Sequence, residues 1–87
     1  MTRLLTSLAS GESMVVEAAL LNGIQLTVLT AVGATATISR VDSKAASVAT
    51  GHGSDATGAP NTRTTITIDW PFYFISVAGG ACRIAVI

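Results

Sequence analysis

The chain has 87 residues, no formal net charge at pH 7 and one cysteine, with 49% hydrophobic and 11% charged residues. One cysteine excludes an intrachain disulfide, and one cysteine with one histidine excludes a zinc site, so we expect neither a metal nor a cofactor. A chain this short forms one domain with a thin core, and its charged residues are too few to cover its surface, since soluble domains average about 25%. Oligomerisation is therefore expected to complete its stability.

The distribution of charged and apolar residues also argues against nucleic-acid and membrane partners. The basic side chains Arg3, Arg40, Lys44, Arg63 and Arg83 are scattered and balanced by acidic ones, whereas phosphate binding needs clustered cations, so no nucleic-acid partner is expected. No apolar run approaches the roughly 18 residues of a membrane span, so no membrane partner is expected. The lone thiol fits synthesis in a reducing cytoplasm.

The N-terminal region allows two interpretations. Residues 3–8 form either a strand or an arm that lies on a neighbouring subunit. Residues 12–21 contain good helix formers between Ser10 and Asn22, which would suit a helix. Alternatively, residues 10–12 form a turn and residues 14–18 a strand. We favour the strand, because the neighbouring segments read as strands.

Two alternating segments follow. Ile24, Leu26 and Val28 fall on one side of an extended chain, and residues 34–41 alternate again after a break at Val32 and Gly33. This pattern predicts a hairpin.

Residues 43–63 break the alternation. The segment is rich in Gly, Ser, Thr and Ala, and Val48 is its only sizeable apolar side chain, so it cannot form a core of its own. We predict one long projecting loop. It contains His52, the only conventional general base, which lies between two glycines and has no plausible nucleophile in sequence context apart from Ser54. The sequence therefore predicts no catalytic residue, no small-molecule substrate and no enzyme.

The C-terminal third has the strongest strand pattern. Ile66, Ile68 and Trp70 share one face, and Pro71 then interrupts the ladder, which predicts a bulge, an edge or a change of strand. Residues 72–78 are apolar on both faces, and Gly79 and Gly80 lead into residues 81–87 as a second predicted hairpin. We expect one mainly β domain over residues 1–87, a small antiparallel sandwich or barrel of about six strands with one long loop.

The aromatic segment supplies the candidate protein interface. Both faces of residues 72–78 require burial, and a domain this small offers a core to only one of them. We expect Trp70 to face the core and Tyr73 to face a partner. In the alternative, one closed core takes Trp70 and Phe74 while Tyr73 packs under the long loop. The predicted interface residues are Trp70, Phe72, Tyr73, Phe74, Ile75 and Val77.

Three segments, residues 8–13, 38–42 and 69–80, give the chain a resemblance to small accessory virion proteins of tailed bacteriophages, among them the capsid decoration, or cement, proteins. The resemblance implies a β-rich protein, often trimeric, that sits on the capsid exterior and bridges neighbouring shell subunits. We therefore expect a structural protein of the virion, preferably a cement protein, with the major capsid protein or other virion proteins as partners. A neck, tail or fibre component and a glycan-binding β module are the alternatives.

Overall fold

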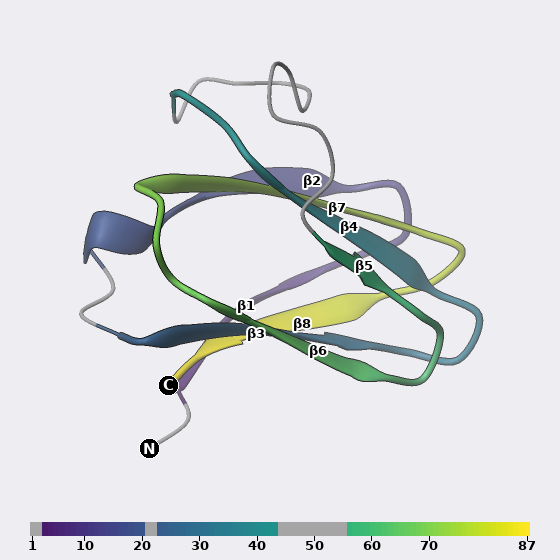
Figure 1. Ribbon diagram of the computed structural model, residues 1–87. Coiled ribbons are helices and arrows are strands. Elements are labelled where there is room, and N and C mark those ends of the chain that lie inside the picture. The colour runs from purple at the N-terminus through teal and green to yellow at the C-terminus, as the bar shows by residue number, and fades with distance from the viewer. Residues whose placement is uncertain (1–2, 21–22, 44–55) are drawn as a thin grey trace.

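The computed structural model describes residues 3–20, 23–43 and 56–87, which form two four-stranded antiparallel sheets packed face to face (Figure 1). Each sheet is named here by one of its central strands. The β8 sheet has the order β1 (Arg3–Leu8), β8 (Cys82–Val86), β3 (Gln25–Thr30) and β6 (Arg63–Thr67). The β7 sheet has the order β2 (Ser13–Glu17), β7 (Phe72–Ala78), β4 (Thr35–Arg40) and β5 (Ala56–Gly58). A 3-10 turn, η1 (Ala18–Leu20), follows β2.

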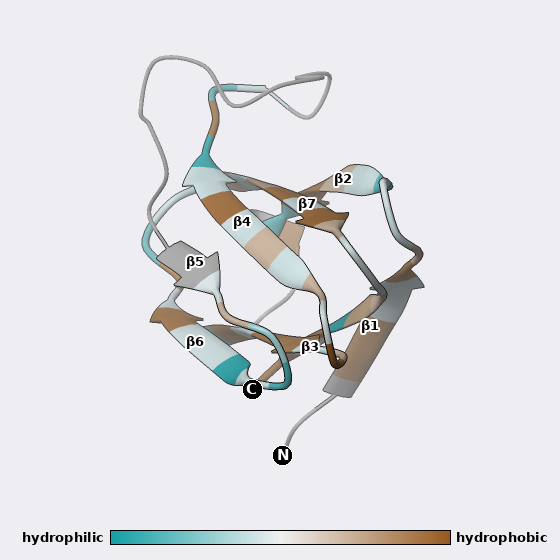
Figure 2. Ribbon diagram, turned by 90° about the vertical axis from the view of Figure 1, so that its right-hand side faces the viewer, coloured by the Kyte–Doolittle hydropathy of each residue, from teal (hydrophilic) through white to brown (hydrophobic). Residues whose placement is uncertain are grey.

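The core lies between the sheets because each strand turns alternate residues inward. The alternation is visible as bands along β4 (Figure 2). Leu26 and Val28 from the β8 sheet meet Ile38 and Ile75 from the β7 sheet, and all four are fully buried. The expected mainly β sandwich is confirmed. No helix of the described residues is long and apolar enough to cross a membrane.

The connections differ from the sequence-based expectation. Strands β3 and β4 lie in different sheets, and so do β7 and β8, so both predicted hairpins are wrong. Every connection except that between β4 and β5 passes from one sheet to the other. The physical reason lies in the double apolar character of β7: as a central strand it pairs with β2 and β4, while β8 pairs with β1 and β3. A short turn with glycine permits either a hairpin or a crossing.

The two mispredicted turns pack against each other. Gly33 and Gly79 both have positive φ angles, of 81° and 80°. A Cβ added to Gly79 would lie 2.5 Å from the carbonyl oxygen of Gly33. Glycine at position 79 is therefore required both by the backbone conformation and by the close approach of the other turn.

Three other expectations have an outcome. Within residues 12–21, strand β2 (Ser13–Glu17) is followed by η1 (Ala18–Leu20), so the favoured strand is confirmed, and Arg3–Leu8 forms strand β1. The long loop is shorter than expected, because Ala56–Gly58 pairs with β4 as strand β5, which brings the described strands to eight instead of about six. The remainder of that loop, with His52, lies largely outside the described residues.

Of the three alternatives predicted at Pro71, a bulge, an edge or a change of strand, the structure shows a change of strand. The chain leaves the β8 sheet after Thr67 and enters the β7 sheet at Phe72, and Trp70 packs against the core on the way. Pro71 has no amide hydrogen to donate, but its carbonyl oxygen accepts a hydrogen bond of 2.9 Å from the Ala18 amide.

Candidate protein interface

The inward face of β7 fills the domain core. Tyr73 and Ile75 are fully buried and Val77 is 3% exposed. The structure therefore places Tyr73 inside the domain, which corrects the partner-facing position expected for it. The reason is strand parity: Tyr73 has the same orientation as Ile75 and Val77, and the β8 sheet covers that face of β7.

The buried Tyr73 hydroxyl has polar partners. It donates a hydrogen bond of 2.9 Å to Oδ1 of Asp69 and accepts one of 3.0 Å from the Asp69 amide. Arg40 reaches the same carboxylate, with Nη2 2.8 and 2.9 Å from its two oxygens. Hydrogen bonds from Arg40 and Tyr73 lower the pKa of Asp69, and burial raises the pKa of Tyr73. This cluster fastens the crossing between β6 and β7 to strand β4.

The outward face of β7 is largely covered as well. Phe74 is only 8% exposed and lies between Val15 on β2 and Ser39 on β4. Phe72 and Trp70 are half-buried, and the indole Nε1 of Trp70 donates a hydrogen bond of 2.9 Å to the Val41 carbonyl. A partner can therefore reach only Trp70 and Phe72 among the six predicted interface residues to any substantial extent.

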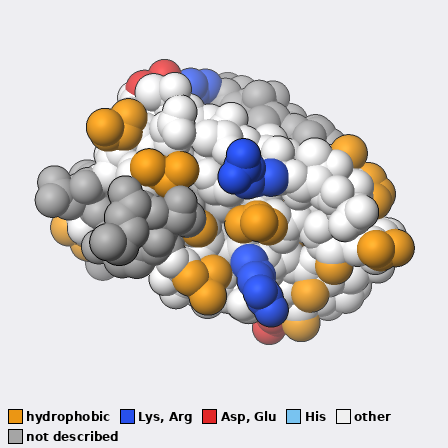
Figure 3. Space-filling view, turned by 90° about the horizontal axis from the view of Figure 1, so that it is seen from below, with side chains coloured by type: hydrophobic (Ala, Val, Ile, Leu, Met, Phe, Trp, Pro, Cys, Tyr) orange, Lys and Arg blue, Asp and Glu red, His pale blue; other side chains and the backbone are white. Residues whose placement is uncertain are grey.

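The outward face of the β8 sheet is open instead. Strand register aligns Ser7, Arg83, Leu29 and Arg63 in one line across the four strands. In the space-filling view, basic side chains stand on either side of a hydrophobic one at the centre of this face (Figure 3). Leu29 is 41% exposed, and the nearby outward residue Leu4 is 59% exposed. We call Arg63, Leu29 and Arg83 the arginine row.

The two cations of the arginine row have no acidic partner among the residues that the structure describes. Arg40 is bound to Asp69, whereas neither Arg63 nor Arg83 forms an ion pair there. Both side chains are exposed, and no acidic residue lies on a strand of the β8 sheet. The face thus combines exposed apolar surface with positive charge that no described acidic side chain neutralises.

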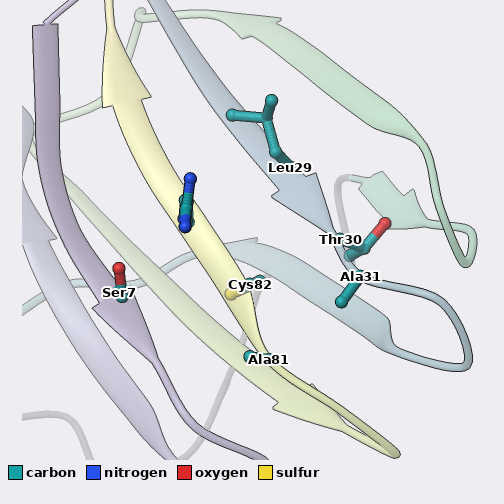
Figure 4. A pocket seen from close by; sticks show the side chains of 7 residues that line it. Ser7, Leu29, Thr30, Ala31, Ala81 and Cys82 are labelled. Carbon is teal, nitrogen blue, oxygen red and sulfur yellow. The ribbon is translucent and has the colours of Figure 1, made fainter.

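A pocket of about 430 Å³ lies beside this row. Ser7 on β1 and Leu29 on β3 stand on its two sides, and Thr30, Ala31 and Ala81 lie at one end (Figure 4). Arg83 and Cys82 complete the lining. The pocket exists because several small side chains meet at this end of the sheet, so the long side chains of Leu29 and Arg83 stand above their surroundings.

The sequence held a partial signal for this site. In the alternation of β3, Gln25 and Thr27 mark the outward phase, and Leu29 is an apolar residue in that polar phase. The arginines carried no such signal, because Arg63 and Arg83 come together only through the pairing of β6 and β8 with opposite edges of β3.

One further reactive group among the described residues is the buried thiol of Cys82. Cys82 is 2% exposed, and burial raises the pKa of its thiol, as expected for a structural cysteine. Within residues 3–20, 23–43 and 56–87, no group of three His, Cys, Asp or Glu side chains is placed to hold a metal ion.

Comparison with known proteins found no match. No family model matches the chain, and neither a curated protein nor a solved structure matches it. A functional proposal therefore depends on the residues of this chain.

Proposed function

We propose that this chain is a structural protein of a larger protein assembly, and specifically a capsid cement protein of a tailed phage that binds neighbouring shell subunits as a homotrimer. The observation that carries the proposal is the open face of the β8 sheet, where Leu29 is exposed between two arginines that no described acidic residue pairs, and Leu4 is exposed on the edge strand β1. A free monomer gains nothing from such a face, whereas a protein partner covers it. The low charge content and the resemblance to accessory virion proteins support the virion setting.

The burial of the aromatic residues weighs against the glycan-binding alternative. Sugar-binding modules present exposed aromatic rings around a groove, but Tyr73 is fully buried, Phe74 is 8% exposed, and Trp70 and Phe72 are half-buried. Attachment by protein contacts instead gains free energy from buried apolar surface, about 25 cal/mol per Å² before the costs of association are subtracted. Several copies attached to one assembly raise the effective affinity further.

Two measurements test this function. Light scattering after size-exclusion chromatography is expected to give a trimer, and quantitative mass spectrometry of purified phage particles is expected to find the chain at a copy number near that of the major shell protein. A copy number of a few per particle would favour the neck, tail or fibre alternative. A stable monomer that is absent from particles would contradict the proposal.

A variant tests the face itself. Leu29→Glu places a carboxylate between Arg63 and Arg83, so the isolated domain is expected to keep its melting temperature while attachment to particles is lost. Val32→Glu makes the same change at an 81% exposed position in the turn between β3 and β4 and should leave attachment unchanged. Equal attachment of both variants would exclude this face as the interface.

A further inference from the structure

We infer that the arginine row docks an acidic protein surface, in which two carboxylates flank an apolar residue. The inference rests on the proposed function, since the partner is taken to be a protein component of the same assembly. It adds the chemistry of that partner: a carboxylate for each of Arg63 and Arg83, and an apolar side chain against Leu29.

The geometry of the row sets the spacing of the partner. Arg63 on β6 and Arg83 on β8 both lie opposite Leu29, so the two arginines are separated by two strand spacings, or about 10 Å. Each guanidinium carries a fork of N–H donors that fits a carboxylate in a bidentate manner. The domain already uses this arrangement once, between Arg40 and Asp69.

Two other occupants fit the row less well. A second copy related by a two-fold axis would oppose arginine to arginine, and the described acidic residues that could neutralise it lie off the β8 sheet: Glu12, Glu17, Asp42 and Asp69. A nucleic-acid backbone would satisfy the cations but would leave Leu29 against charged phosphates. A protein surface supplies carboxylates and apolar contact together.

The pocket beside Arg83 suits an acidic side chain. Leu29, Ala31 and Ala81 provide apolar lining, while Ser7 offers a hydroxyl near the arginine. A glutamate side chain has an apolar stem and a charged end, so it matches this lining in both parts. Arg83 is therefore expected to contribute more to binding than Arg63, which does not line the pocket.

The test uses the full chain and a defined probe. Amide chemical shifts of the isotope-labelled protein are followed while an acetylated, amidated Thr-Glu-Thr-Leu-Thr-Glu-Thr peptide is added. We expect saturable shifts centred on β3, β6 and β8 that disappear as the salt concentration is raised from 0.05 to 0.5 M. Arg63→Gln should raise the dissociation constant about twofold and Arg83→Gln about fivefold, both within the range for exposed charge pairs. Arg83→Lys keeps the charge and should raise the dissociation constant less than Arg83→Gln does.

Controls decide between the occupants. The same peptide with Gln in place of Glu should cause no shifts on this face, and equal binding of that peptide would overturn the inference. A heparin tetrasaccharide or a ten-residue thymidine oligonucleotide that binds the same arginines more tightly than the acidic peptide would overturn it as well. Spectra and melting temperatures of the arginine variants establish that each remains folded.

Particles separate this inference from the proposed function. If the chain is abundant on particles but Arg63→Gln and Arg83→Gln attach as well as the parent at every salt concentration, the inference fails and the proposed function stands. If the acidic peptide binds as expected but particles lack the chain, the proposed function fails and the inference stands.

Discussion

The outward faces of the two sheets differ in how much apolar surface they leave to solvent. On the β7 sheet, Phe74 is 8% and Ser39 is 1% exposed, whereas on the β8 sheet Leu29 is 41% and Leu4 is 59% exposed. Phe74 is large and stands on a central strand between neighbours on both sides. Leu29 also stands on a central strand, but small alanines adjoin its pocket. An outward apolar side chain thus indicates an interface only when its own neighbours fail to cover it.

The largest expected effect is the difference in stability between the variants Phe74→Ala and Leu29→Ala. Phe74→Ala should lower the free energy of unfolding by about 3 to 4 kcal/mol, because it empties a buried site even though the residue points away from the core between the sheets. Leu29→Ala should lower it by less than about 1 kcal/mol, since the side chain is already partly hydrated. Urea denaturation of the two variants measures both values.

Tyr73→Ala is the reference for the core and should lower the free energy of unfolding at least as much as Phe74→Ala does. If Phe74→Ala is as mild as Leu29→Ala, the outward face of the β7 sheet is not covered in solution. The two faces would then be equally open, and Phe74 would regain its place as an interface candidate.

A second prediction tests the turns that hold both faces in place. Gly79→Ala should lower the free energy of unfolding by about 3 kcal/mol, because alanine is strained at φ 80° and its Cβ would meet the Gly33 carbonyl oxygen. Gly11→Ala is the matched control: its φ is 84°, but no atom lies within 4 Å of the added Cβ. Its cost should be about 1 kcal/mol. Thermal unfolding with calorimetry separates the two, and equal losses would show that the turns do not pack against each other.

These two regions also show what the sequence could and could not predict. Alternation along β3, β4 and β6 predicts strands and the mainly β class, because the period of two depends only on which residues face the core. Pairing depends on the other sheet as well. The glycines at positions 33 and 79 permit a hairpin or a crossing equally, so both predicted hairpins failed although the turns were placed correctly.

The candidate site was missed for the same reason. Tyr73 and Phe74 are adjacent and both apolar, and the sequence does not say which of them faces the second sheet. The structure shows that the domain covers both, and that the open face belongs to strands with ordinary alternation. The arginine row exists only through register, since Arg63 and Arg83 are each paired with Leu29 from a distant part of the chain.

A smaller effect on stability is expected when the buried hydroxyl groups on the outward faces of the two sheets are removed. Ser39 Oγ on the β7 sheet is buried with no hydrogen-bond partner among the described residues, whereas Thr27 Oγ1 on the β8 sheet lies 3.2 Å from Thr65 Oγ1. Ser39→Ala should therefore leave stability unchanged or raise it by up to about 1 kcal/mol. Thr27→Val removes a paired hydroxyl and should cost about 0.5 to 1 kcal/mol. Chemical denaturation measures both, and a loss for Ser39→Ala would show that its hydroxyl has a partner in solution.

The smallest expected effect is a loss of stability at low pH, which arises at the crossing between β6 and β7. Hydrogen bonds from Arg40 and Tyr73 lower the pKa of Asp69, so the unfolded chain binds a proton at this site before the folded chain does. The resulting stability is present above the unfolded pKa of about 3.9 and is lost as the pH falls through the lower folded pKa. The effect is small because the Asp69 side chain is 56% exposed and water screens the ion pair.

Melting temperatures between pH 5 and pH 2 test this assignment. The melting temperature of the parent should fall the most. That of Tyr73→Phe should fall less, because the carboxylate keeps only its hydrogen bonds from Arg40, and that of Asp69→Asn least, because its amide does not titrate. Carbon chemical shifts of the Asp69 carboxyl group give its pKa directly, which should rise in Tyr73→Phe. An Asp69 pKa at the ordinary value would show that the Arg40 and Tyr73 contacts do not persist in solution, and the crossing would then be held by packing alone.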